Sequence, residues 1–408
     1  MPRTSRLKIS RSKMGIFIPK DKLQNLKLYK YSAEDHSLVS RYVLKKWWNL
    51  FVKIFPMSMA PNVITLLGLF FVLGNLLCVF YYDPFLNTDS PRWCYFFYAF
   101  GLFMYQTFDG CDGCHARRTG QSGPLGELFD HSIDAINTTL SCIVFASVFQ
   151  LGFGYLLFIA QLASVCNFYT STWEEYHTHT LYLSLFSGPV EGILILCSLF
   201  VLTGLIGPGI WKYELFTLDL SSLGFGVYGI NTTTILSLLG LGQLYFNISG
   251  TMKNVSKYYK SDGKLLDKDV DKKISDAYKG LIPFFAYYTS ILALLYTFPE
   301  TITDFGFPLI ISIGSSIAFC VGRIIVAHLT LQSFPFKQVP TAIPLVQLVI
   351  AKYLISVYGY DRASTLGAII WTGAGVTLGI HGMFVAEVIM EITAYLDIYA
   401  LSIKHKKV

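Results

Sequence analysis

The chain has 408 residues, of which 53% are hydrophobic and only 14% are charged, and its formal net charge is +6. Soluble proteins carry about 25% charged residues, so this composition excludes an ordinary soluble domain and predicts an all-α, polytopic membrane protein. The basic residues do not gather on one soluble domain, which argues against a nucleic-acid partner. Most of the eight cysteines lie inside apolar runs and are expected to be free thiols.

The N-terminal part of the chain is polar. Residues 1–35 are rich in lysine and arginine and show no periodic apolar face, so we expect a cytosolic tail. Residues 36–58 are expected to form an interfacial amphipathic helix, because apolar residues recur there at near-helical spacing with lysines between them. Trp47 and Trp48 suit the headgroup layer of a membrane.

Apolar runs long enough to cross a bilayer follow this segment. A span needs roughly 18 or more residues, and ten such runs can be counted, although blurred edges leave eight or nine open. They lie near residues 62–82, 92–110, 126–150, 153–173, 188–206, 223–247, 281–298, 305–327, 341–358 and 366–392. The sequence therefore predicts about ten transmembrane helices.

Lysine and arginine should collect in the cytosolic connections of such a protein. With a cytosolic N-terminus, that side receives Arg117, Arg118, eight lysines between Lys253 and Lys279, Lys337, Lys404, Lys406 and Lys407. The opposite side receives little beyond Arg92, Lys212 and Arg362. The charge distribution supports ten spans and predicts that residues 109–134 lie at the cytosolic face.

The connection between the second and third runs is rich in acids, and ionisable groups at membrane depth are costly. Its four aspartates are Asp109, Asp112, Asp130 and Asp134. The first two share one helical face and the last two share another, so two antiparallel helices would aim all four carboxylates at one point. Such carboxylates repel unless a cation compensates. Carboxylate oxygens favour hard divalent ions, and four ligands predict two Mg²⁺ or Mn²⁺ ions, an arrangement suited to phosphorus chemistry.

Other residues of this connection fit the same chemistry. Arg117 offers a bidentate partner for a phosphate. Gly113 and Gly126 leave room for a ligand or backbone to approach. His131 is the candidate base for a hydroxyl that attacks phosphorus, although a lone histidine is more often a satisfied polar group.

The run DGCDGCHARRTGQSGPLGELFDHSID matches the signature of the CDP-alcohol phosphotransferases, D-x2-D-G-x2-A-R-x8-G-x3-D-x3-D, at eight fixed positions. The chain also resembles the eukaryotic choline and ethanolamine phosphotransferases, especially the fungal ones, from Met14 onward. This similarity includes the stretches APNVITLLG, STWEEYHTHTLYL, GPVEG and LDIYALSIKH. Residues 1–13 fall outside the resemblance.

The resemblance implies an activity. Family members transfer phosphocholine or phosphoethanolamine from CDP-choline or CDP-ethanolamine to the hydroxyl of 1,2-diacylglycerol. The products are phosphatidylcholine or phosphatidylethanolamine and CMP, in the last step of the Kennedy pathway. Relatives of the fungal type accept both donors, and we expect the same here.

The resemblance also implies roles for individual residues. The four aspartates would hold two metal ions on the CDP pyrophosphate, and Arg117 would steady a phosphate. His131 would be the base, assisted by Glu191 of GPVEG, which the topology puts at the same depth. Asn62 and Gln106 are candidates for contacts with the nucleotide, and Asn62 serves equally well as a helix cap.

The same resemblance suggests a division of the chain and a setting. The division has a tail (1–35), an interfacial helix (36–58), a catalytic core of about six spans (59–248), a charged cytosolic loop (249–280), about four further spans (281–392) and a basic cytosolic tail (393–408). The family implies a homodimer in the endoplasmic reticulum or Golgi, with the active site on the cytosolic face. Lysines near the C-terminus resemble an endoplasmic-reticulum retrieval signal, but a plain basic end explains them as well.

Three other interpretations remain open. An ion-coupled transporter also has many spans and buried acids, but it predicts a repeat of the acidic cluster in a second half. A related enzyme could use another acceptor alcohol, such as inositol or glycerol phosphate, but such members are usually much shorter. A noncatalytic scaffold would leave the complete set of metal ligands unexplained.

Overall fold

A computed structural model of the chain describes residues 15–35, 37–183, 189–219, 221–223, 226–261 and 267–405. Several predictions from the sequence lie outside the described residues. They concern residues 1–14, Gly188 of GPVEG, residues 262–266 of the charged loop and the tail lysines Lys406 and Lys407.

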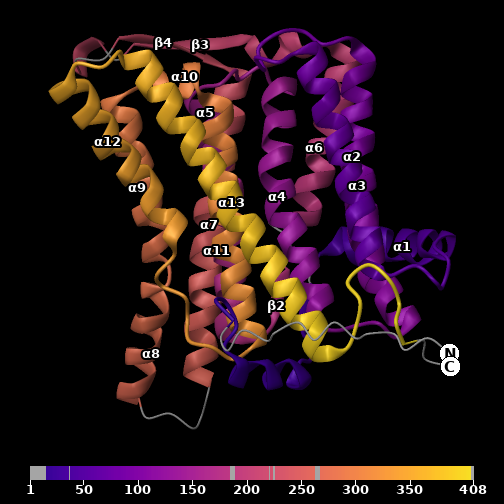
Figure 1. The fold of residues 1–408 in the computed structure, drawn as a ribbon. Helices are drawn as coiled ribbons and strands as arrows, with labels where there is room; N and C mark the ends of the chain where they lie inside the picture. The colour runs from indigo at the N-terminus through magenta and orange to yellow at the C-terminus, as the bar shows by residue number, and fades with distance from the viewer. Residues whose placement is uncertain are drawn as a thin grey trace, which may run out of the picture.

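Most of the chain forms one bundle of helices (Figure 1). The helices are α1 (Lys45–Phe51), α2 (Pro61–Tyr82), α3 (Arg92–Thr119), α4 (Pro124–Val148), α5 (Tyr155–Thr178), α6 (Pro189–Ile206), α7 (Thr232–Ser261), α8 (Asp267–Lys279), α9 (Ile282–Thr297), α10 (Glu300–Asp304), α11 (Gly306–Leu329), α12 (Ile343–Tyr358) and α13 (Arg362–Leu396). An antiparallel hairpin of β3 (Glu214–Asp219) and β4 (Val227–Asn231) covers the end of the bundle away from both termini (Figure 1). A second pair, β1 (Ala33–Asp35) and β2 (Leu181–Leu183), is parallel.

Each of the ten apolar runs overlaps one long helix, which confirms a multi-pass, all-α membrane protein. By length and composition, five helices of the described residues could cross a membrane. They are Pro61–Tyr82, Asp269–Thr297, Gly306–Leu329, Val339–Tyr358 and Arg362–Leu396. Val190–Ile206 is a shorter apolar helix. The count of ten spans is therefore not confirmed.

The sixth apolar run does not begin as a helix. Residues 227–231 form β4, and α7 starts only at Thr232. The side chain of Asn231 accepts a hydrogen bond from the Thr234 amide at 2.8 Å, which caps the new helix. The polar cap, rather than the start of the apolar run at 223, sets this helix boundary.

The core of the bundle is organised around α11. This helix is apolar around its circumference and is buried along most of its length, as expected for a hydrophobic helix without a polar face. It packs against α4, α5 and α13. On the other side of the bundle, α3 packs between α2 and α6. The position of α4 links these two halves.

The interfacial segment is helical, as predicted, but it is not one regular helix. A π-helical turn (Ser40–Leu44) leads into α1, and a 3-10 turn (Val52–Ile54) follows it. The helical turns end at Ile54, and Phe55 is the C-cap residue directly before Pro56. The segment lies across the direction of the long helices (Figure 1).

The two tryptophans of this segment pack against α3. Trp48 is only 9% exposed and packs on Gly110 of α3. Trp47 donates from Nε1 to Thr107 Oγ1 of the same helix at 3.1 Å. A glycine and a hydroxyl on α3 provide the fitting surface, and the place of these indoles in the headgroup layer stays a prediction.

Residues 15–35 are not an unpacked tail. Ile18 and Leu26 are buried in the same apolar cluster as α11 and α13. Asn25 donates to the Thr330 carbonyl at 2.8 Å, and Arg323 donates to the Phe17 carbonyl at 3.1 Å. The segment thus closes the end of the bundle at which α3 and α4 meet, a contact that its polar composition does not predict.

The packing of Trp48 on α3 can be tested with Gly110→Ala. A Cβ at Gly110 would lie 2.2 Å from Trp48 Cε2, so the indole must move. We expect a loss of about 1–3 kcal/mol of stability, as for other overpacked sites, visible as a lower melting temperature in detergent. The control is Gly250→Ala in α7, where a Cβ meets nothing within 4 Å. Equal melting of the two variants would contradict the packing.

Candidate functional site

The site begins with the turn between α3 and α4. Gly120 ends α3 with φ of +67°, a left-handed conformation that favours glycine, and the Gln121 amide bonds back to the Ala116 carbonyl at 2.8 Å. Pro124 occupies the first turn of α4, where a missing N–H costs nothing. A short turn thus joins two antiparallel helices, as the spacing of the aspartates predicts.

Three of the four aspartates converge. Asp109, Asp130 and Asp134 each offer a carboxylate oxygen, and these oxygens lie within 4.8 Å of one another. Asp112 is 8% exposed and accepts a hydrogen bond from Thr65 Oγ1 of α2. Its charge acts on both Asp109 and Asp130. The structure therefore brings the four carboxylates to one place, with Asp112 turned toward α2.

Neutral groups hold two of these carboxylates. Gln106 donates from Nε2 to Asp109 Oδ2 at 3.2 Å, and the Tyr105 hydroxyl donates to Asp134 Oδ1. Gln106 was predicted to contact a nucleotide, but here it orients a carboxylate one turn further along α3. Tyr105 and Thr65 were not predicted. Tyr105 precedes Asp109 by four residues, a helical spacing that could have identified it.

The carboxylates have little counter-charge from the part of the chain that the structure describes. Among the described residues, no lysine or arginine forms an ion pair with any of the four aspartates, and His131 Nδ1 lies 3.9 Å from Asp130 Oδ2. Asp130 Oδ1 is buried without a hydrogen-bond partner. Buried carboxylates are normally paired or bind metals. The donor set is all oxygen, so these residues fit hard divalent cations such as Mg²⁺ or Mn²⁺.

The two arginines that follow have different surroundings. Arg118 donates to the Val52 and Phe55 carbonyls at 2.9 and 3.1 Å and so holds the interfacial segment against α3. Arg117 is exposed, and it donates to Cys114 Sγ at 3.3 Å. A thiol is a weak acceptor, so this guanidinium remains available to a phosphate. Gly113 lies beside this guanidinium, since a Cβ added to Gly113 would be 3.5 Å from Arg117 Nη1.

His131 is 8% exposed and has a carboxylate near each ring nitrogen, Asp130 near Nδ1 and Glu175 near Nε2. Its Nδ1 lies 3.0 Å from the Glu127 carbonyl, one turn earlier in α4. Its Nε2 lies 3.6 Å from Glu175 Oε2 of α5. Because a carbonyl only accepts, Nδ1–H donates to it, which orients the ring and leaves Nε2 as the nitrogen that can accept a proton.

The acidic neighbour of His131 is thus Glu175, which the sequence analysis missed. Glu175 belongs to the quoted stretch STWEEYHTHTLYL and follows the fourth apolar run, so the depth argument applied to Glu191 would have identified it as well. Glu191 accepts a hydrogen bond from Ser37 Oγ of the interfacial segment. Its second oxygen, Oε2, is buried without a partner.

Asn62 lies at the first turn of α2 but does not cap that helix. It donates from Nδ2 to the Ala400 carbonyl at 2.9 Å, so it holds the C-terminal segment. A Cβ on Gly126 would lie 4.0 Å from Asn62 Oδ1, which places this amide beside the start of α4. Gln121 donates to the His405 carbonyl at 3.0 Å. Part of the predicted basic tail therefore packs at the site.

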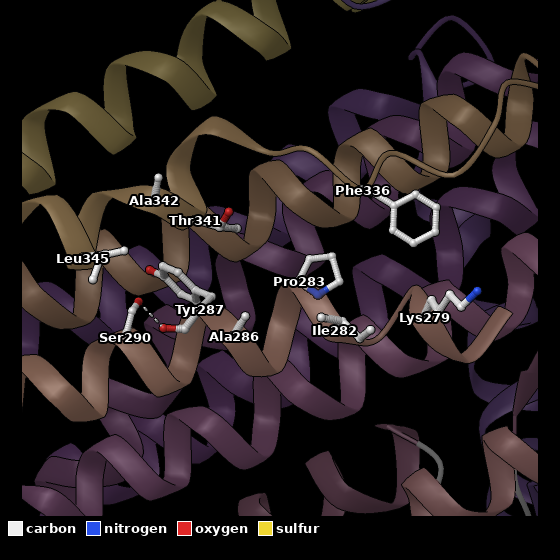
Figure 2. A pocket seen from close by; sticks show the side chains of 10 residues that line it. All are labelled: Lys279, Ile282, Pro283, Ala286, Tyr287, Ser290, Phe336, Thr341, Ala342 and Leu345. Carbon is white, nitrogen blue, oxygen red and sulfur yellow. Dashed lines mark hydrogen bonds between the residues drawn. The ribbon is translucent and has the colours of Figure 1, made fainter. Parts of the chain in front are cut away.

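Two apolar cavities lie away from the aspartates. One, of about 540 Å³, lies where α9 meets α12 (Figure 2). Its lining residues are Lys279, Ile282, Pro283, Ala286, Tyr287, Ser290, Phe336, Thr341, Ala342 and Leu345. The other, of about 690 Å³, lies between α3 and α6 and is lined by Phe96, Ala99, Phe100, Phe103, Leu194, Cys197, Ser198 and Val201. The two helices that form the second cavity, α3 and α6, also carry Asp109 and Glu191.

The predicted free cysteines are confirmed: all eight are free. Cys111 is buried and donates to the Trp48 carbonyl at 3.6 Å. Cys114 accepts from Arg117. The CxxC pair is therefore part of the packing of α3.

Comparisons with known proteins agree with these observations. Residues 58–215 match the family model described as CDP-alcohol phosphatidyltransferase. The chain is 53% identical over 395 residues to Choline/ethanolaminephosphotransferase 1 of Saccharomyces cerevisiae, covering 97% of this chain and 100% of that protein. It is 50% identical to Cholinephosphotransferase 1 of the same yeast, with the same coverage. It is 33% identical to Choline/ethanolaminephosphotransferase 2 of Arabidopsis thaliana, covering 94% of this chain and 97% of that protein.

The carboxylate cluster predicts metal binding that can be measured without turnover. In Asp130→Asn, one carboxylate ligand becomes a neutral amide. Loss of a residue that only hydrogen-bonds a metal ligand typically lowers metal affinity roughly tenfold or more. We expect loss of a ligand itself to lower Mn²⁺ affinity by more than roughly tenfold. The readout is free Mn²⁺ by electron paramagnetic resonance. The control is Glu174→Gln, a buried carboxylate whose hydrogen bond from Asn254 a glutamine can still accept. Equal Mn²⁺ binding by Asp130→Asn and the control would refute the site.

Proposed function

Because the chain belongs to the CDP-alcohol phosphatidyltransferase family, we propose that it transfers phosphocholine and phosphoethanolamine from their CDP esters to 1,2-diacylglycerol. The products are phosphatidylcholine or phosphatidylethanolamine and CMP. The observation that carries the proposal is the convergence of Asp109, Asp130 and Asp134, with Asp112 beside them, at the predicted cytosolic face. The relatives named for these reactions match nearly the whole chain.

The donor would bind at the aspartates. Two Mg²⁺ or Mn²⁺ ions held there would neutralise the CDP pyrophosphate and polarise the phosphorus that is attacked. Arg117, whose only described hydrogen bond is to a thiol, would bind a phosphate oxygen. Gly113 and Gly126 carry no side chain that would obstruct the nucleotide. Asn62 would contact the nucleotide only after its hydrogen bond to the Ala400 carbonyl is broken. Gln106 would act on the nucleotide indirectly, through its hydrogen bond to Asp109.

The transfer itself needs a base. The diacylglycerol oxygen forms a bond to the phosphorus of the phospho-alcohol, the bond from that phosphorus to CMP breaks, and CMP leaves as an anion. His131 accepts the hydroxyl proton. The Glu127 carbonyl accepts a hydrogen bond from Nδ1–H, which leaves Nε2 as the nitrogen that takes the proton, and Glu175 beside Nε2 would stabilise the imidazolium that forms.

Glu191 remains a proposed partner of His131. Its described contact is with Ser37, and its free Oε2 is buried. Glu175 is the carboxylate that contacts the ring in the described residues. We assign to Glu175 the contact with the imidazole in the absence of substrates. We assign to Glu191 a role once the substrates are bound.

The lipid acceptor requires an apolar route. The cavity between α3 and α6 is lined almost wholly by apolar side chains, and the helices that form it also carry Asp109 and Glu191. We assign this cavity to an acyl chain of diacylglycerol. The cavity between α9 and α12 is formed by neither of the two helices that carry the aspartates.

The membrane setting completes the proposal. We place the site on the cytosolic face of the endoplasmic reticulum or Golgi membrane, which the distribution of lysines and arginines supports. The division into a catalytic core at 59–248 and a C-terminal group of helices remains a prediction, as does the homodimer.

The direct test is turnover of CDP-choline and CDP-ethanolamine, side by side, by the purified protein with diacylglycerol. We expect both phospholipids to form, each with one equivalent of CMP. Turnover of only one donor would restrict the head group. No transfer from either donor in the presence of Mg²⁺ or Mn²⁺ would reject the proposal.

The base is tested by separating binding from transfer. His131→Ala should slow transfer at least about 100-fold, as expected for loss of a general base, and should leave CDP-alcohol binding largely intact. Asp112→Ala should lose both, because a carboxylate for the cations is removed. Binding is followed by calorimetry and transfer by labelled lipid. Substantial turnover in His131→Ala would reject His131 as the base.

The acyl-chain cavity is tested by filling it. Ser198→Trp places an indole at an exposed position of the α3–α6 cavity and should raise KM for diacylglycerol without changing that for CDP-choline. Ala286→Trp is the matched control, at an exposed position of the α9–α12 cavity. The assignment is wrong if Ala286→Trp raises the lipid KM and Ser198→Trp does not.

A further inference from the structure

A second group of potential metal ligands lies on the other side of His131. Glu127 of α4, Glu175 of α5 and His328 of α11 each offer one ligand atom, and these atoms lie within 4.8 Å of one another. The three residues are about 50 and 150 positions apart in the chain, so only the fold brings them together. None of them belongs to the aspartate cluster.

The two carboxylates of this group lack adequate partners. Glu175 is only 5% exposed, and no hydrogen bond to its carboxylate is described among these residues. Its one ion-pair contact there is with His131, at 3.6 Å. Glu127 Oε1 is buried and has no hydrogen-bond partner. Two carboxylates so close together repel, and a buried carboxylate without hydrogen bonds is costly. A cation between them would remove both costs.

We propose that Glu127, Glu175 and His328 form a separate site for a divalent cation of borderline softness, with Zn²⁺ as the representative ion. Histidine nitrogen and carboxylate oxygen are both zinc ligands, and three such ligands leave a fourth position open, as in catalytic zinc sites. Mg²⁺ prefers oxygen ligands and near-octahedral geometry. The histidine therefore distinguishes this site from the all-oxygen aspartate site.

Neighbouring groups orient two of the three ligands. The Tyr29 hydroxyl donates to Glu127 Oε2. His179 Nδ1 lies 3.3 Å from His328 Nδ1, so one ring donates to the other. Hydrogen bonds of this kind orient metal ligands and tune their affinity.

Occupancy of this site would affect transfer, an effect that rests on the proposed function. The Glu175 carboxylate lies 3.6 Å from His131 Nε2 and also belongs to the ligand group. A bound Zn²⁺ would therefore take up the negative charge of Glu175, weaken its stabilisation of the imidazolium that forms during transfer, and slow turnover. The inferred site is inhibitory toward the reaction at the aspartates.

The test is Zn²⁺ binding by the full-length protein in detergent, with millimolar Mg²⁺ present to occupy the aspartate site. Competition with a chromophoric chelator measures affinity without turnover. We expect one tight Zn²⁺ equivalent in the wild type, and a loss of roughly tenfold or more in affinity for His328→Gln and Glu127→Gln. The matched control is His381→Gln, a buried histidine of α13 with both ring nitrogens unpartnered, which should bind Zn²⁺ as the wild type does.

Transfer assays on the same proteins separate the outcomes. Micromolar Zn²⁺ should inhibit transfer by the wild type and by His381→Gln. It should inhibit transfer by His328→Gln much less. Without Zn²⁺, His328→Gln should retain Mg²⁺-supported transfer. Unchanged Zn²⁺ affinity in His328→Gln, or no bound equivalent in the wild type, would overturn the site. Binding without inhibition would overturn the inhibitory role. Because binding is measured by itself, failure of the proposed function would not affect this result.

Discussion

Four clustered carboxylates, with no lysine or arginine paired to them among the described residues, are the constraint on which this structure depends. They meet because the turn at Gly120 and Pro124 sets α3 and α4 antiparallel. Groups on neighbouring segments then stabilise the arrangement, with Thr65 of α2 bonding to Asp112 and Arg118 holding the interfacial segment. The remaining charge is not satisfied within the protein, since Asp130 Oδ1 has no partner. A ligand that carries cations is the simplest physical solution.

Two unlike substrates must reach this one point. A CDP-alcohol is highly charged and fits the polar end of the bundle, where both terminal segments pack and Arg117 is exposed. Diacylglycerol is a membrane lipid, and the apolar cavity between α3 and α6 is formed by the helices that carry Asp109 and Glu191. His131 follows Asp130 on α4, and its ring faces Glu175 of α5, so the proposed base adjoins the proposed cation site.

The sequence predicted the parts of the site that depend on local spacing. The aspartates are three or four residues apart on two continuous helices, so helical periodicity alone aligned them. Contacts between distant segments were missed. Trp48 fits α3 only because Gly110 faces it, and Ile18 is buried only because α11 and α13 leave room. Glu175 and His328 lie about 150 residues apart, and no periodic pattern connects them. Asn231 caps the start of α7, so this helix begins later than the apolar run at 223, which hydropathy does not register.

The central claim is that the aspartate cluster exists to hold divalent cations for transfer to a lipid hydroxyl. The most direct measurement is CMP release from CDP-choline by the purified protein with diacylglycerol, before and after removal of divalent cations by a chelator. The account predicts that CMP release stops on chelation and returns when Mg²⁺ or Mn²⁺ is restored, always with one phosphatidylcholine per CMP. Equal turnover with and without divalent cations would contradict it.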